Sequence, residues 1–190
     1  MTCGPVPRTL IFVAGVLIAP VSAGLSQDSA ALIRSAISGR WSDAATWERG
    51  RVPGANAKVQ IRQGHVVEYD VQSDQPIRTI HVAGTLSFAP DRHTRLDVGL
   101  IKIQPSDDAS EDGFDCDAHV PAVEPGQPRP ALVVGTPEQP ITASHTALIR
   151  LTSFDGMDRQ SCPAIVCCGG RMDFHGAPLN RTWVKLGQTA

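Results

Sequence analysis

The chain has 190 residues, of which 42% are hydrophobic, 5% aromatic and 19% charged, enough for one globular domain or one domain plus a processed leader. Seventeen Lys and Arg residues against 19 Asp and Glu residues leave a formal charge of −2, too small to favour nucleic acid or an anionic membrane as partner. The 17 Gly and 15 Pro residues interrupt the chain too often for long helices, and the apolar content is too high for disorder. Composition therefore indicates β structure with many turns.

Residues 1–23 have the three parts of a secretory signal peptide. Arg8 precedes an apolar run over residues 9–19, and Val21-Ser22-Ala23 provides a small-residue cleavage site. The run is shorter than the roughly 20 residues that span a bilayer, and no second such run follows. We therefore expect cleavage after Ala23 and a secreted chain, periplasmic in a bacterium, without membrane insertion. An uncleaved membrane anchor is the alternative.

Residues 24–39 are expected to form an N-terminal leader to the domain. Within it, residues 30–37 (Ala-Ala-Leu-Ile-Arg-Ser-Ala-Ile) carry the only apolar spacing in the mature chain that is typical of a helix. A short helix and a flexible leader both fit this segment.

From Lys58 onward, apolar residues recur at every second position in short runs, which predicts β-strands. Each run is closed by Gly, Pro, Asn or Asp. The runs lie at residues 59–61, 66–69, 80–88, 96–98, 101–103, 132–134, 147–151, 165–167 and 172–174.

Two of these segments, residues 80–88 and 165–174, look like copies of one unit with one residue inserted. Each has an apolar pair, a glycine corner and a second apolar pair. Glycine permits a sharp turn between two strands, and stacked copies of such a unit would form a β-solenoid. A β-sandwich has similarly short strands, so the residues alone leave both architectures open.

Residues 104–130 differ from the rest of the chain, because an acidic stretch is followed by a Pro-rich one. We expect an exposed insertion on the strand scaffold. Asp112, Asp115 and Asp117 are candidate ligands for Ca²⁺, the one cofactor considered, although their spacing does not match an EF-hand loop. A solvated run of charges is the alternative.

Four cysteines remain after signal cleavage: Cys116, Cys162, Cys167 and Cys168. In an oxidising compartment this even number predicts disulfides, with three possible connectivities. Neighbouring strand residues point to opposite faces, so one of Cys167 and Cys168 would face the core while the other reaches Cys116 or Cys162. Zinc is an alternative, but the paired Cys-x-x-Cys spacing of a specific zinc site is missing.

Several short elements, in their order along the chain, resemble the G8 domain, a module named for its eight glycines. The elements are Trp41 and Trp47, residues 50–54 (Gly-Arg-Val-Pro-Gly), 59–61, 64–67 and Asp70, the corner at 80–88, the strands near 96–103, residues 132–140 with a Gly-Thr-Pro-Glu sequence, the strand at 149–151, and residues 169–176 and 183–186. The resemblance covers residues 40–187. Each element is weak alone, whereas their collinear order is specific.

The resemblance implies a right-handed parallel β-helix-like solenoid and so favours it over the sandwich. It also implies a secreted or cell-surface protein that binds or processes an extracellular polysaccharide, because the family includes hyaluronan-binding and hyaluronidase relatives. A long parallel β-helix follows the module in its larger relatives and is missing before Ala190. We therefore expect either a fragment of a longer product or a shortened form.

Asp173 and His175 are the candidates for acid–base chemistry, because they alternate on one expected strand and so share a face. The alternative is that this Gly-flanked histidine satisfies backbone groups. Glycoside hydrolysis usually needs two carboxylates about 5 to 10 Å apart. No family catalytic residue matches a motif present here. Whether the chain is an enzyme therefore stays open; if it is catalytic, we expect a polysaccharide hydrolase.

Trp41 and Trp47 are candidates for stacking on sugar rings, or for plugging the open end of a solenoid. An anionic glycan such as hyaluronan needs cationic partners, and Arg62 and Arg78 near His81 are the candidates. We therefore expect an extracellular polysaccharide or glycoprotein as partner. A structural β-helical cap or adhesive module without a small ligand is the alternative, and it predicts buried aromatic rings and dispersed cations.

Overall fold

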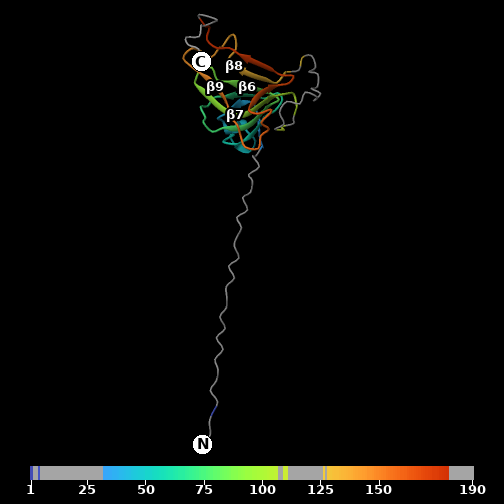
Figure 1. Cartoon of the computed structure of the whole chain (residues 1–190). Coiled ribbons are helices and arrows are strands. Elements are labelled where there is room, and N and C mark those ends of the chain that lie inside the picture. The colour runs from blue at the N-terminus through green and yellow to red at the C-terminus, as the bar shows by residue number, and fades with distance from the viewer. Residues whose placement is uncertain (2–3, 5–31, 107–108, 111–125, 127, 180–190) are drawn as a thin grey trace, which may run out of the picture.

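Strands make up nearly all regular structure in the part of the chain that the computed structural model describes, which comprises residues 1, 4, 32–106, 109–110, 126 and 128–179 (Figure 1). Eleven strands and two short 3-10 helices follow one another. In chain order they are β1 (Leu32–Arg34), β2 (Gly39–Arg40), η1 (Ala44–Thr46), η2 (Glu48–Gly50), β3 (Lys58–Ile61), β4 (Val66–Tyr69), β5 (Ile77–Val82), β6 (Thr85–Phe88), β7 (Thr94–Ile103), β8 (Ala131–Val134), β9 (Ala147–Leu151), β10 (Ala164–Cys167) and β11 (Arg171–Phe174). The expectation of an all-β domain is confirmed.

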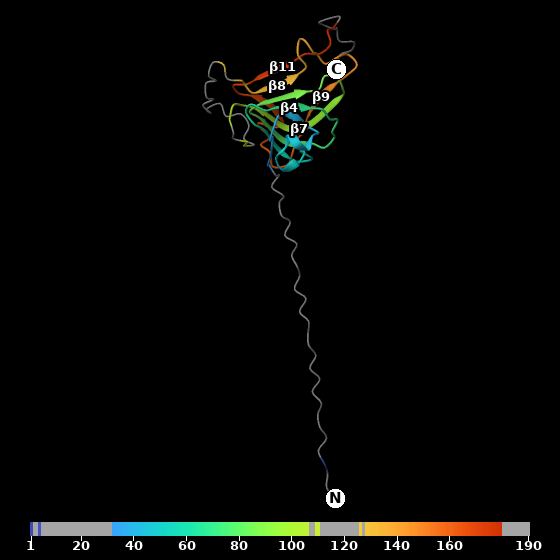
Figure 2. The same ribbon diagram turned by 180° about the vertical axis from the view of Figure 1, so that it is seen from behind.

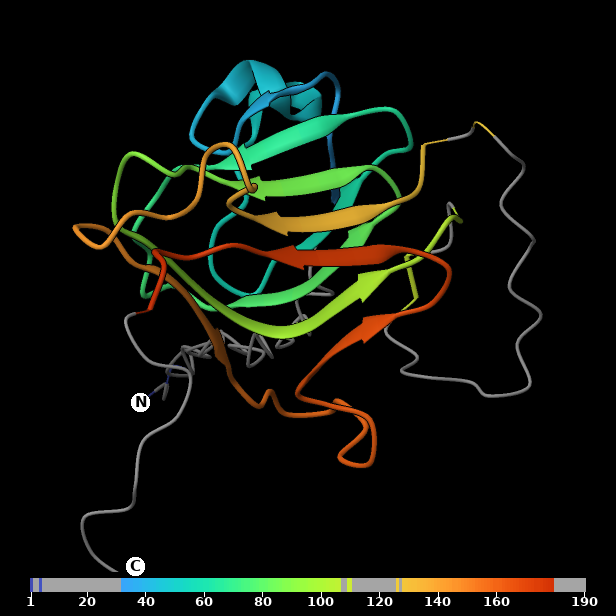
Figure 3. The same cartoon turned by 90° about the horizontal axis from the view of Figure 1, so that it is seen from above.

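Successive strands alternate between two sheets. The first sheet has the order β1-β3-β5-β7-β10, with β9 also pairing with β7, and the second has the order β2-β4-β6-β8-β11. All pairings between these strands are parallel. Figure 3 shows the second sheet as a stack running from cyan through green and yellow to red, and Figure 2 shows β11 beside β8 at its edge. The antiparallel pairing expected of a β-sandwich is not found among the strands of the described residues.

Each strand of the first sheet and the next strand of the second sheet form what we call a rung; β10 and β11 are the terminal rung. Side chains on the inner face of each rung stack on the matching residues of the next, since the register is continuous. The columns are Val59-Ile80-Ile101-Ile165 and Ile61-Val82-Ile103-Cys167 in the first sheet, and Val67-Leu86-Leu132-Met172 and Tyr69-Phe88-Val134-Phe174 in the second. Each fully buried aliphatic side chain contributes roughly 1.5–3 kcal/mol.

The described part of the expected leader is a strand rather than a helix. Residues Leu32 to Arg34 pair in parallel with Lys58 to Gln60, and Ile33 enters the core with 5% of its surface exposed. Pairing with a distant strand overrides the weak helical spacing of this segment. The domain therefore includes residues 32–40, and the predicted signal peptide, apart from Met1 and Gly4, lies outside the described residues.

A long bent strand, β7, joins two runs that the sequence presents separately. Its first half pairs with β9 and its second half with β10. Gly99 lies between the halves, where a Cβ atom would be 2.6 Å from the carbonyl oxygen of Arg78. Glycine thus lets the backbone of β5 lie close to β7 at the position where the partner of β7 changes from β9 to β10. Residues 104–130, the expected insertion, connect β7 to β8, and most of them lie outside the described residues.

The two copies of the predicted repeat occupy equivalent places, as β5-β6 and β10-β11. Gly84 and Gly170 each come directly before the second strand of their rung. A Cβ atom at Gly84 would lie 2.3 Å from the carbonyl oxygen of His65, and one at Gly170 would lie 2.8 Å from that of Pro130. The next residue, Thr85 or Arg171, donates its N–H to that same carbonyl at 2.8 and 3.0 Å. A side chain at either glycine would collide with the carbonyl oxygen that accepts this hydrogen bond. The corner therefore requires glycine for the hydrogen bond between rungs to form.

Replacing Gly84 by alanine should destabilise the domain by about 1–3 kcal/mol, because the new methyl group meets the backbone oxygens of two preceding residues. Gly176→Ala is the matched control, since no atom lies within 4 Å of its Cβ position. Urea unfolding followed by tryptophan fluorescence measures both variants. Equal stability of the two would contradict the role of Gly84 at the corner.

Candidate functional site

Trp41 and Trp47 close the N-terminal end of the domain. Each of the two residues is 2% exposed, and the ring centroids lie 4.9 Å apart in an edge-to-face arrangement. The indole N–H of Trp47 donates to the carbonyl oxygen of Trp41 at 2.8 Å. Tyr69 continues the aromatic cluster, 5.1 Å from Trp41. These rings offer no free face to a sugar, so the prediction that they form a stacking platform is wrong and the plug interpretation fits.

The predicted cationic surface is not assembled. Arg62 follows the end of β3 and pairs with Glu48, whereas Arg78 lies near the start of β5, over the ring of Phe154 at 5.8 Å. The strands β3 and β5 are neighbours, and their register places these two arginines at opposite ends of the strand pair. His81 is 3% exposed, between Gln60 and Lys102 in the ladder. Arg62, Arg78 and His81 therefore do not share one open surface.

Asp173 and His175 are two positions apart in the chain, and their contacts differ. Asp173 lies on the outer face of β11 and forms an ion pair with Arg171 at 2.8 Å. His175 comes directly after the strand, donates its backbone N–H to Val134 at 2.8 Å and accepts from Ile141 at 2.9 Å. His175 lines a hollow, and Asp173 is not among the described residues of that lining. The structure thus does not bring the two together as an acid–base pair.

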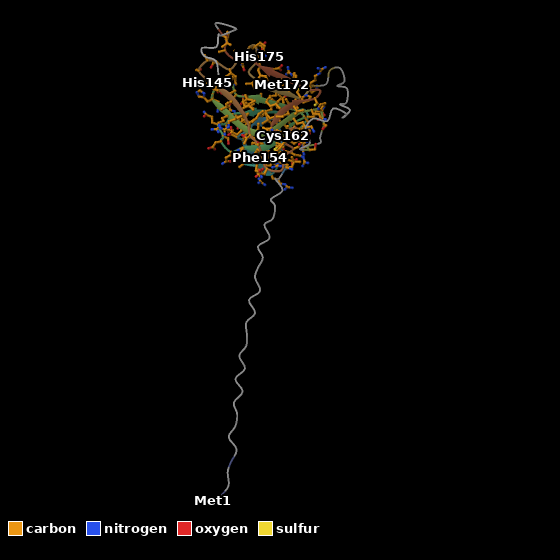
Figure 4. The ribbon with its side chains drawn as sticks, viewed as in Figure 1. Met1, His145, Phe154, Cys162, Met172 and His175 are labelled. Atoms are coloured by element: carbon orange, nitrogen blue, oxygen red, sulfur yellow. The ribbon has the colours of Figure 1, made fainter. Side chains whose placement is uncertain are left out.

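The hollow beside His175, which we call the terminal hollow, has a volume of about 540 Å³ and lies between β8, β9 and the end of β11. It combines the exposed ring of Phe174, which is 55% exposed, with imidazole and hydroxyl groups. Figure 4 shows His145 and His175 in the same upper part of the domain, away from Phe154. The described lining residues are Val134, Ile141, Thr142, Ala143, His145, Thr146, Ala147, Phe174, His175, Gly176, Ala177 and Leu179.

A short turn before β9 fixes the ring of His145. The backbone N–H of His145 donates to the carbonyl oxygen of Thr142 at 3.1 Å, and the Thr142 hydroxyl lies 2.9 Å from Nδ1. The ring of His93 packs against it edge-to-face at 5.5 Å. When Thr142 donates this bond, the ring proton is on Nε2, which can donate to a ligand oxygen.

Sequence reasoning missed His145 and the terminal hollow. The local signal is the Ser/Thr-rich turn at residues 142–146 (Thr-Ala-Ser-His-Thr) before a strand. The hollow itself depends on long-range pairing, since residues around Ile141 and Gly176 meet through a parallel bridge. No spacing within the sequence indicates that contact.

Cys162, Cys167 and Cys168 are free cysteines, so the predicted disulfide is not found among these three. Burial raises the pKa of the Cys167 thiol. Cys116 lies outside the described residues, as do the candidate Ca²⁺ ligands Asp112, Asp115 and Asp117. Within the described part of the chain, no group of three or more His, Cys, Asp or Glu residues is placed to hold a metal ion.

A buried carboxylate holds β9, one wall of the terminal hollow, against β7. Asp97 is 1% exposed and lies opposite Arg150 in the β7–β9 ladder. Its oxygens contact Arg95 at 2.8 Å and Arg150 at 2.9 Å. The hydrogen bond from Arg95, aided by the charge of Arg150, holds the pKa of the Asp97 carboxyl below its usual range despite burial.

Comparison with known proteins identifies one family. The family profile of the G8 domain matches residues 46–187. No curated protein and no solved structure shows significant similarity to the chain. Among the described residues, the structure contains no helix that is long and apolar enough to cross a membrane.

Replacing Asp97 by asparagine should lower stability at pH 7 by about 1–3 kcal/mol, because the charge-assisted bonds to both arginines are lost. The folded-state pKa of Asp97 lies below the value of about 3.9 in an unfolded chain, so its stabilisation is complete above about pH 5 and is lost as the pH falls through the folded-state pKa. The difference in the free energy of unfolding between wild type and variant, measured by urea unfolding, should therefore decrease as the pH is lowered from 5 to 3. Asp91→Asn, which removes an exposed pair with Arg92, is the control and should leave the wild-type curve nearly unchanged. A gap that stays constant over this range would contradict the role of Asp97.

Proposed function

Because the chain belongs to the G8 family, we propose that it is an extracellular module that binds a polysaccharide, with the terminal hollow as its sugar site. The observation that carries this proposal is the combination of an exposed aromatic ring, Phe174, with the oriented imidazole of His145 in one concave surface. Its volume of about 540 Å³ falls in the range of about 300–1,000 Å³ that is usual for small-molecule sites.

The lining suits a sugar ring because it offers both apolar and hydrogen-bonding groups. Phe174 and Leu179 present apolar surface to the face of a pyranose. His145, His175 and Thr142 provide polar atoms at its rim, and each hydrogen bond to a sugar hydroxyl is worth about 1 kcal/mol net. None of the described lining residues is Lys or Arg. We therefore propose that a neutral polysaccharide binds at least as tightly as hyaluronan.

Binding rather than hydrolysis is the proposed activity of the terminal hollow. A glycosidase usually places two carboxylates across the scissile bond. No Asp or Glu is among the described lining residues, and Asp173 lies on the outer face of β11. The lining formed by the described residues thus lacks the usual pair of carboxylates, while it retains groups that can bind sugar hydroxyls.

We also propose that the two sheets are walls of one right-handed β-helix. The parallel pairing in both sheets, with successive strands alternating between them, supports this architecture. Crossover connections between parallel strands of one sheet are right-handed in about 98% of cases, which supports the hand.

A structural role is the second candidate function, and the Trp cluster favours it. Buried tryptophans together with dispersed Arg62, Arg78 and His81 are the arrangement predicted for a β-helical cap without a small ligand. In that role the module closes one end of a β-coil in an extracellular protein. The two candidates are separated by a binding measurement on the folded chain.

His145→Ala and Phe174→Ala should each weaken polysaccharide binding about five- to tenfold, because they remove a hydrogen-bonding ring or the apolar face of the hollow. Isothermal titration calorimetry with neutral polysaccharides and hyaluronan, with and without Ca²⁺, measures the affinity. Arg40→Ala is the matched control, since its exposed side chain lies on β2, far from the hollow in sheet order.

Saturable binding that both hollow variants weaken and the control retains would support the sugar site. Absence of binding by a chain with a cooperative unfolding transition would contradict it and leave the structural role. Binding that survives both hollow variants would place the sugar elsewhere on the domain.

A further inference from the structure

The second sheet ends at β11, whose outer backbone edge has no strand partner among the described residues. Met172 and Phe174 continue inner columns of the core, yet they are 45% and 55% exposed, whereas the preceding residue in the first of these columns, Leu132, is fully buried. An edge strand with exposed apolar side chains is a template for pairing with another strand. β11 therefore has the two features, an open backbone edge and exposed apolar side chains, that favour pairing with a further strand.

The opposite end of the domain cannot accept this edge in a head-to-tail stack. Trp41 and Trp47 close that end, with η1 and η2 beside them, and both rings are buried. A symmetric dimer needs no such acceptor, because a two-fold axis brings the same surface of both copies together.

The sequence of β11 is self-complementary in charge. Arg171 and Asp173 flank Met172 and lie on the outer face of the strand, where they pair with each other at 2.8 Å. Antiparallel pairing centred on Met172 places Arg171 of each copy opposite Asp173 of the other. Two opposite-charge pairs then form on the outer face, while Met172 packs against its counterpart on the inner face.

Neighbouring registers are worse. Pairing centred on Asp173 places two carboxylates directly opposite each other, which is destabilising. A shift by a single residue places inner-face residues opposite outer-face residues, which exposes the apolar column. Charge and burial therefore select the register centred on Met172.

We propose that β11 joins two copies of this chain in a symmetric dimer by antiparallel pairing centred on Met172. The dimer covers the exposed methionines and continues the second sheet from one copy into the other. Phe174 belongs both to β11 and to the terminal hollow, whereas Arg171 and Asp173, which set the register of the dimer, do not line the hollow. The dimer presents two terminal hollows on one particle, so a long polymer with repeated binding sites would be held by both.

Sedimentation velocity of the full secreted chain over a range of concentrations tests the proposal. Wild type should show a reversible monomer–dimer equilibrium. Arg171→Asp places two aspartates opposite the two Asp173 carboxylates, and Asp173→Arg places arginines opposite arginines, so each single variant should weaken dimerisation at least tenfold. The double variant R171D/D173R restores opposite charges and should recover the dimer.

Arg40→Asp is the matched control, because Arg40 also forms an outer-face ion pair, with Glu68, but on β2 at the other edge of the same sheet. It should leave the equilibrium unchanged. Circular dichroism verifies that each single variant is folded. A wild type that is monomeric at every concentration overturns the proposal. The edge of β11 would then pair with residues 183–186 of the same chain or with another protein. A folded double variant that does not recover the dimer overturns the register.

Discussion

The parallel register between rungs is the constraint on which the rest of the structure depends. At the corners before β6 and β11, a carbonyl of one rung accepts an N–H from the next, and Gly84 and Gly170 leave room for that bond. Once this register is set, residues two apart on every strand fall into continuous inner columns. Register is strongly specified here because a one-residue slip would turn an apolar column to solvent.

The two ends of these columns differ in how far their apolar side chains are covered. At the first rungs, Trp41 and Trp47 cover the columns and are themselves buried. At the terminal rung, Met172 and Phe174 remain exposed, and the terminal hollow opens beside them. The groups that we propose to bind sugar and the edge that we propose to form the dimer therefore lie at one end of the columns, and the buried Trp cluster lies at the other end. Asp97 links the two properties, because it anchors the β9 wall of the hollow to the buried strand β7.

Local pattern predicts the strands from residue 58 onward, and the glycine corner predicts the repeat of β5-β6 in β10-β11. Features that depend on distant partners could not be predicted. Leu32 to Arg34 become a strand through β3, and β9 joins β7 across 53 positions, from Thr94 to Ala147. The tryptophans show the same limit, since aromatic residue type fits both a sugar platform and a plug, and only burial decides. His145 lines the terminal hollow because the residues around Ile141 and Gly176 meet, and no sequence motif indicates that contact.

Amide hydrogen exchange of the full chain, followed by residue, tests the stacked-register account most directly. The account predicts the slowest exchange in β3 to β8, where both neighbours are strands of adjacent rungs, and intermediate protection in β1 and β2, which each have one strand partner but lie under the Trp cluster. It also predicts that Thr85 and Arg171, the residues after the glycine corners, are protected like strand residues. Rapid exchange at both corner residues, or at β1 and β2, would contradict a coil of register-locked rungs that is closed at its first end.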